Sequence, residues 1–314
     1  MKDYAKTQKQ DRELPKTASV RHGRIRKKRT FREHISSLVF LAPSLIGVLV
    51  FFVVPFGVVG YYSVVDNPIT RQFVGLDNFK RILGNAAFRI AAKNTGTFSL
   101  IAVPAAVILS LLLAMMLECK IPFKSQLRSF FLSPLMVPIA SVVLIWQVLF
   151  HDNGVINQLL GNLGVQGVDW LKSDQAQIVI VILFLWKNLG YNMILFMAAL
   201  GNIPQDIIEV ARLESANSFQ IFFRIKLRYL SPTILFVTIM SLINSFKVFR
   251  EIYLLTGKYP FSSIYMLQHF MNNTFLSLDY QKLSAAAIIM SLVMVVIIGI
   301  LFITEYFFGR DVEE

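Results

Sequence analysis

The sequence has a single cysteine, Cys119, in 314 residues. One thiol can form neither an internal disulfide nor a thiolate metal cluster, so both are excluded within this chain. The four histidines include no pair at the spacing of metal ligands. Charged residues make up only 16% of the chain, whereas 55% of it is hydrophobic. This composition is too apolar for a soluble domain of this length and predicts an integral membrane protein.

Sequence motifs of catalytic chemistry are missing as well. There is no Gly-rich phosphate loop, because Gly257-Lys258 lacks both the earlier glycine and the following Ser or Thr that the motif requires. The chain contains no H-E-x-x-H and no G-x-S-x-G, the motifs of metalloproteases and serine hydrolases. We therefore expect no ATP site, no bound cofactor and no enzymatic activity in this chain.

Long hydrophobic runs, by contrast, are abundant. Six of them are long enough to cross a hydrocarbon core of about 30 Å at 1.5 Å per residue, at approximately residues 38–62, 96–118, 129–150, 177–200, 232–255 and 284–308. Each run is continuous rather than alternating, which favours helices over barrel strands. Pro134 and Pro138 lie in the third run and are expected to kink it. The sequence predicts an all-α integral membrane protein with six transmembrane helices.

Positive charge is distributed unevenly along the chain. The net charge is +12, and residues 1–36 hold 12 Lys and Arg against four acidic residues. Such a basic segment could bind nucleic acid in a soluble protein, but directly before a membrane span it indicates a cytoplasmic tail that contacts anionic lipid. With the N-terminus inside, the inner segments hold 20 Lys and Arg and the outer segments hold 8. We therefore predict that both termini are cytoplasmic, with a tail at 1–36 and a membrane domain at 37–314.

The predicted inner segment 201–231 contains an amphipathic stretch of mixed charge. Asn217 and Gln220 have the spacing of a capping box, so we expect two short helices joined by a turn before Asn217. The second helix would carry an apolar face made of Phe219, Phe222, Phe223 and Leu227. We expect the three phenylalanines to pack on the membrane bundle; contact with a partner protein is the alternative that stays open. Its physical pattern alone is also compatible with an ordinary loop between two spans.

The residues of this stretch resemble the E-A-A loop motif of permease subunits of binding-protein-dependent ABC importers. The matching positions are Glu209, Ala211, Glu214, Ala216, Gln220, Phe222, Ile225, Leu227, Leu230 and Pro232. Three residues depart from the pattern, namely Val210 for alanine, Ser215 for glycine and Arg228 for proline. The missing glycine matters most, because a sharp turn is expected there. Residues 73–79, 146–157 and 256–260 resemble three further motifs of the same family.

From about residue 38 to its end, the chain is most similar to maltose-type permeases of carbohydrate-uptake ABC importers. The resemblance implies a bacterial inner-membrane protein that works with a second permease, two copies of an ATPase subunit and an extracytoplasmic solute-binding protein. It implies that Glu209 forms an ion pair with an ATPase arginine, within an ATPase-coupling site that also includes Ala211, Glu214, Ser215 and Ala216. ATP would be used only by the partner.

The solute implied by the resemblance is a sugar or an oligosaccharide. Two alternatives stay open at the level of the sequence. One is an importer of the same build for a non-sugar solute such as glycerol phosphate. The other is a stand-alone secondary transporter. Such transporters often contain two related repeats, but residues 38–150 and residues 177–308 show no repeat relationship.

Polar residues interrupt the fourth and fifth runs. A charged residue at the centre of a membrane helix costs about 2.5–3.5 kcal/mol on insertion scales, so such groups usually face a cavity or each other. We predict a solute pathway lined by Asn188, Tyr191, Asn244, Lys247 and Arg250. In the alternative interpretation, Lys247 and Glu251 neutralise one another four residues apart, and the asparagines only join helices.

Overall fold

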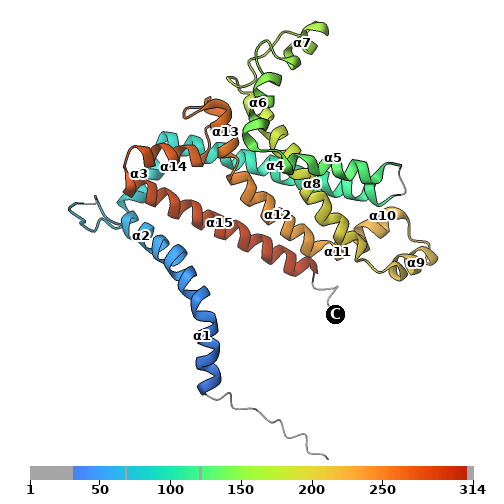
Figure 1. The fold of residues 1–314 in the computed structure, drawn as a ribbon, viewed down its shortest axis with the longest axis horizontal. Helices are drawn as coiled ribbons and strands as arrows, with labels where there is room; N and C mark the ends of the chain where they lie inside the picture. Colours follow the sequence, from blue (N-terminus) through green and yellow to red (C-terminus); the bar gives the residue numbers. More distant parts are fainter. Residues whose placement is uncertain (1–30, 68, 120–121, 310–314) are drawn as a thin grey trace, which may run out of the picture. The chain divides into compact units, whose positions relative to one another are not determined.

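The computed structural model describes residues 31–309 except residues 68, 120 and 121 (Figure 1). Its longer helices are α1 (Phe31–Val48), α2 (Val54–Ser63), α3 (Asp77–Gly84), α4 (Ala86–Glu118), α5 (Lys124–Met136), α6 (Ile139–Leu149), α7 (Val155–Asn162), α8 (Ala176–Gly201), α9 (Gln205–Leu213), α12 (Ser231–Phe246), α13 (Phe249–Thr256), α14 (Leu267–Leu276) and α15 (Tyr280–Gly309). The chain divides into two units, with the boundary between Pro55 and Phe56. Within the described ranges, the predicted all-helical membrane fold is confirmed.

The first predicted span is a helix from Phe40 to Ser63, formed by α1, a π-helical turn at Leu49–Val53 and α2. None of its apolar window is buried inside the chain. A helix that is apolar all round and unburied in its own chain is suited to contact with lipid or other subunits. Helix α1 already begins at Phe31, inside the predicted tail, whereas residues 1–30 lie outside the described residues.

The third predicted span is broken rather than kinked. Helices α5 and α6 meet at an angle of 101°. Pro138 is the N-cap of α6, and Val137 before it is extended, at φ −82° and ψ 128°. The residue before a proline is biased away from the α-helical region toward extended conformations, which favours a break at this position. The described residues thus contain five helices able to span a membrane, or six if this bent pair is one span.

The second span begins ten residues earlier than predicted. Helix α4 starts at Ala86, where the side chain of Asn85 caps it by accepting a hydrogen bond from the Phe88 amide at 3.0 Å. With 33 residues α4 is about 50 Å long, more than a hydrocarbon core requires. Hydropathy alone missed this start because its first turns are polar and amphipathic.

Two asparagines, from the motifs at residues 73–79 and 146–157, form hydrogen bonds to the loops between spans. The Asn157 side chain donates to Val168 O at 2.8 Å and accepts from the Trp170 indole nitrogen at 2.9 Å, which closes the loop before α8. Asn78 donates to the carbonyls of Ser63 and Val65 at 3.0 and 2.8 Å. Both side chains are buried, and their hydrogen bonds satisfy loop backbone that would otherwise be unpaired.

Helices α4 and α8 pack against each other and form the centre of the second unit (Figure 1). Helix α5 also packs on α8, at Gly190, where the two backbones approach very closely. A methyl group added at Gly190 would lie 1.9 Å from the Phe131 carbonyl oxygen. Only glycine fits between these two helices, since any side chain there would overlap with main-chain atoms.

Candidate functional site

The stretch that resembles the importer loop motif folds as two short helices, as the sequence predicts. Helix α9 ends at Leu213, and α10 (Ser218–Ile221) continues through a π-helical segment at Phe222–Lys226 into α11 (Leu227–Tyr229). The capping box is present. The backbone N–H of Gln220 donates to Asn217 Oδ1 at 2.8 Å, and the backbone N–H of Asn217 donates to Gln220 Oε1 at 2.9 Å. We call residues 201–231 the loop domain.

Ser215 stands in the turn between these helices with a φ of +63°, in the left-handed region. This is the position where the family motif has glycine, and glycine adopts such a conformation without steric cost. The amide of the next residue, Ala216, donates to the carbonyl of Ala211 at 2.9 Å. The turn therefore keeps the shape that glycine would favour, although the residue is serine.

The predicted coupling residues lie on α9 and in the turn that follows it. Glu209, Glu214 and Ser215 are exposed, while Ala211 and Ala216 are half-buried against the bundle. Sequence reasoning missed Leu213, which is 85% exposed and lies three residues beyond the exposed Val210. Their i, i+3 spacing places both residues on one face of α9, and this spacing was the available signal.

The expectation that three phenylalanines pack on the bundle is wrong for two of them. Phe219 is 69% and Phe223 is 48% exposed, and their rings lie 4.4 Å apart. Only Phe222 packs against the buried core. Phe219 and Phe223 are four residues apart and share one face of the helix, whereas Phe222 is turned about 100° from Phe223 and reaches the core.

Buried side chains fix the loop domain to the membrane helices. Ile208 and Ile221 belong to a core cluster that also contains Met193 and Phe196 of α8. Other members of the same cluster are Leu200, Leu230 and Val237. Lys226 in the second half of the loop pairs with Glu118 at the end of α4, at 2.8 Å. Apolar burial and this ion pair thus connect the loop domain to α8, α12 and α4.

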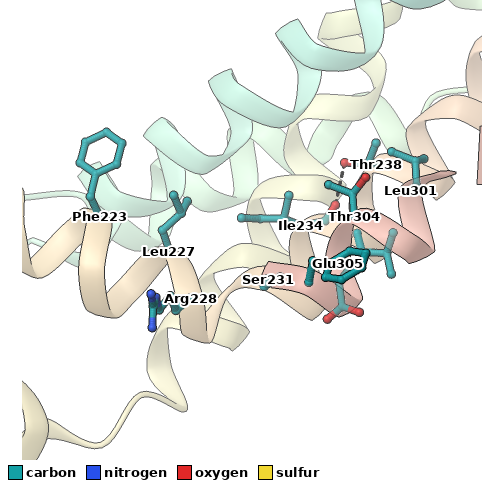
Figure 2. A pocket seen from close by; sticks show the side chains of 11 residues that line it. Phe223, Leu227, Arg228, Ser231, Ile234, Thr238, Leu301, Thr304 and Glu305 are labelled. Atoms are coloured by element: carbon teal, nitrogen blue, oxygen red, sulfur yellow. Dashed lines mark hydrogen bonds between the residues drawn. The ribbon is translucent and has the colours of Figure 1, made fainter. Parts of the chain in front are cut away.

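A groove of about 640 Å³ lies beside the loop domain, between its last turns and helices α12 and α15 (Figure 2). Its lining is largely apolar, with Phe223 and Leu227 at one end and Leu301 at the other. Thr238 on its wall donates to the Ile234 carbonyl at 2.7 Å. None of the predicted pathway residues lines this groove. The groove is instead next to the loop domain, which contributes Phe223 and Leu227 to its lining.

The predicted pathway residues gather around a second cavity of about 490 Å³, here called the polar cavity. Four of the five line it: Asn188, Asn244, Lys247 and Arg250. Tyr191 is half-buried and does not line the cavity. It follows Asn188 by three residues, so it lies almost one turn further along α8 toward the loop domain.

Hydrogen bonds join the two helices that meet at the polar cavity. Asn244 Nδ2 donates to Asn188 Oδ1 at 3.0 Å, and Asn188 Nδ2 donates to the Phe184 carbonyl at 2.8 Å. One turn toward the loop, the buried Asn192 donates to Ser241 at 2.9 Å. These contacts connect α8 to α12 by polar pairs, as interhelical amides do in membrane proteins.

The alternative pairing of Lys247 with Glu251 is wrong. Glu251 accepts from Lys187 of α8, 64 residues away, and its side chain is only 6% exposed. Helix α12 ends at Phe246, and α13 begins at Phe249 after a turn. The interruption removes the regular i, i+4 spacing of a continuous helix, on which the alternative pairing depended.

The polar cavity has three further polar side chains that the predicted pathway did not include, Lys187, Glu251 and Gln268. Gln268 lies on α14, outside every predicted span, so neither hydropathy nor spacing pointed to it. The neighbouring His269 is buried with its Nδ1 accepting from the Met266 amide at 3.3 Å. Burial lowers the pKa of His269 to about 4, so its ring is neutral at physiological pH and serves packing rather than charge.

Comparison with known proteins gives consistent matches. A family model described as "Binding-protein-dependent transport system inner membrane component" matches residues 106–314. The trehalose/maltose transport system permease protein of Thermococcus litoralis is 31% identical over 288 residues, covering 90% of this chain and 97% of the relative. The sn-glycerol-3-phosphate transport system permease protein of Pectobacterium atrosepticum is 28% identical, with coverage of 90% and 97%.

A solved structure shares the fold. It is the crystal structure of a bacterial alginate ABC transporter in complex with an alginate pentasaccharide-bound periplasmic protein. A chain of that complex superposes with a TM-score of 0.74 at 21% identity, over 87% of this chain and 96% of that one.

Proposed function

Because this chain belongs to the family of binding-protein-dependent transport system inner membrane components, we propose that it is a permease subunit of an ABC importer for a sugar or oligosaccharide. The curated relatives support this substrate class, since their names refer to trehalose and maltose, arabinooligosaccharides and lactose. The relative named for glycerol phosphate supports the same build with a different solute. The chain supplies the membrane pathway and has no enzymatic step of its own.

One observation carries the mechanism: the loop domain and the polar cavity are built on the same helices. Helix α8 contributes Asn188 to the cavity and Phe196 to the cluster that holds Ile208 of the loop domain. Packed helices move as rigid bodies because protein interiors are dense and hardly compressible. A force on the loop domain therefore shifts α8 and α12 and changes the shape of the polar cavity.

The force would come from an ATPase subunit that docks on the loop domain and uses the ATP. The coupling site would comprise Glu209, Ala211, Glu214, Ser215 and Ala216, with Glu209 in an ion pair with an ATPase arginine. The loop domain exposes the apolar residues Val210, Leu213 and Phe219, which offer apolar surface to a docking partner. Two ATPase copies, a second permease and an extracytoplasmic binding protein complete the proposed importer.

Replacing Glu209 with alanine is expected to uncouple the importer without preventing its insertion. Loss of one partner of an interfacial ion pair costs about 2–5 kcal/mol when the pair is buried and much less at a wet rim. Solute uptake and solute-stimulated ATPase activity should therefore fall together in reconstituted complexes. Asp174→Ala, which removes an exposed carboxylate far from the loop domain in sequence, is the matched control and should leave both rates unchanged. Wild-type rates in the Glu209 variant would exclude it from coupling.

The proposed topology places both termini and the loop domain in the cytoplasm. Arg81 of α3 and Arg212 of α9 are both exposed, so cysteines there should react with a membrane-impermeant thiol reagent from opposite sides. The native Cys119 is exposed and must first be replaced with serine. Cells should label at position 81, and inverted vesicles at position 212. Labelling of both positions from one side would contradict this topology.

A further inference from the structure

The polar cavity carries more positive than negative charge. Its four charged side chains are Lys187, Lys247, Arg250 and Glu251. Lys187 and Glu251 form an ion pair and compensate each other. Lys247 and Arg250 are exposed, and no ion pair involves either within the described part of the chain. The cavity therefore offers two cations that are free to meet a further anion.

The position of these cations restricts what they can face. Both belong to the apolar segment Ser231–Thr256, which is long enough to cross a membrane. Exposure of a charged side chain to lipid is costly, so such residues face a water-filled cavity or an opposite charge. The turn between α12 and α13 places Lys247 and Arg250 beside the polar cavity rather than along a lipid-facing helix.

The uncharged side chains of the polar cavity have a complementary chemistry. Asn188, Asn244 and Gln268 bring amide groups to its wall, and amides both donate to and accept from hydroxyl groups. Guanidinium and ammonium groups favour carboxylate, phosphate and sulfate oxygens, through charge-assisted hydrogen bonds. The cavity thus combines donors for an anionic group with amides suited to the hydroxyls of a sugar.

On the premise that the proposed function holds, we propose that the imported solute is an acidic carbohydrate. Lys247 and Arg250 would bind its anionic group, and Asn188, Asn244 and Gln268 would bind its hydroxyls. The anionic group would be a carboxylate, as in uronate saccharides, or a phosphate ester. The Lys187–Glu251 pair holds α8 and α13 together. Lys247 and Arg250 then remain available to select an anionic solute over a neutral one.

The test compares uptake of matched acidic and neutral solutes in cells that carry this chain with its native partners. The pairs are oligogalacturonates against galacto-oligosaccharides, oligomannuronates against manno-oligosaccharides, and glycerol 3-phosphate against glycerol. Wild-type cells should import an acidic member in preference to its neutral counterpart. The first two pairs report a carboxylate and the third a phosphate ester. Uptake of no acidic member would overturn the inference. Failure to import any of the six and also maltose, trehalose, arabino-oligosaccharides and lactose would overturn the proposed function itself.

Variants then assign the preference to this cavity. Replacing Lys247 and Arg250 together with glutamine should lower acidic uptake by about tenfold or more, which corresponds to about 1.4 kcal/mol. The charge-conserving pair Lys247→Arg and Arg250→Lys should retain most uptake, and Lys93→Gln on α4 should behave as wild type. Preferential wild-type uptake of the neutral members would overturn the inference but not the proposed function. So would loss of complex assembly in the glutamine variant, which would mean that the cations pair with acids of the second permease.

Discussion

Replacing Gly190 with alanine is expected to disrupt the packing of α5 on α8 and to prevent accumulation of a stable permease. The added methyl carbon would lie 1.9 Å from the Phe131 carbonyl oxygen and 2.6 Å from its carbonyl carbon. These are main-chain atoms, so no change of rotamer relieves the overlap and one helix must move. Overpacking costs about 1–3 kcal/mol in well-packed cores, and we expect the upper end here or more.

The loss should appear as a lower thermal midpoint of the detergent-solubilised complex and as a lower yield of protein in membranes. Gly201→Ala in the same helix is the control, because a methyl group there has no neighbouring atom within 4 Å. It should be neutral or slightly stabilising, as alanine favours helix over glycine by up to about 1 kcal/mol. Equal thermal midpoints for the two variants would contradict the close contact at Gly190.

The second large effect is expected from Glu251→Gln at the polar cavity. This change leaves Lys187 without its anionic partner inside the bundle. Breaking a buried ion pair from one side costs about 3–5 kcal/mol. Because the Lys187 side chain retains 31% exposure, we expect the lower end of that range or less. The thermal midpoint of the complex should fall, and uptake should fall with it, since the pair holds α8 to α13.

A double-mutant cycle separates the pair from the individual side chains. Lys187→Met should also destabilise, whereas the double variant with Glu251→Gln should recover part of the loss, because no unpaired charge remains. The difference between the double variant and the two single variants gives the coupling energy. Strict additivity would mean that the two side chains act independently.

Local structure in the loop domain could be predicted from sequence because its determinants are local. The capping box of Asn217 and Gln220 needs only residues three apart, and Ser215 occupies the turn that the family motif marks with glycine. Which face of the second helix packs on the bundle could not be predicted. That contact depends on Met193, Phe196 and Val237 of α8 and α12, which are placed only by the tertiary fold.

The residues of the polar cavity were also only partly predictable from the sequence. The polar residues that interrupt the fourth and fifth hydrophobic runs were sufficient to select Asn188 and Asn244, since polar groups in an apolar span must find partners. Their partners depend on how helices far apart in sequence pack together. Glu251 pairs with Lys187 across 64 residues, and Gln268 reaches the cavity from α14, a helix outside the predicted spans.

A bundle of membrane helices with a two-helix loop between spans follows from the sequence alone, because hydrophobic length and capping are properties of contiguous residues. Three features required the folded structure: the angle of 101° between α5 and α6, the close approach of the α5 backbone to Gly190, and the position of Lys247 and Arg250 at the polar cavity. These features depend on contacts between distant segments. The free energy of such contacts is set by close packing and charge pairing in three dimensions.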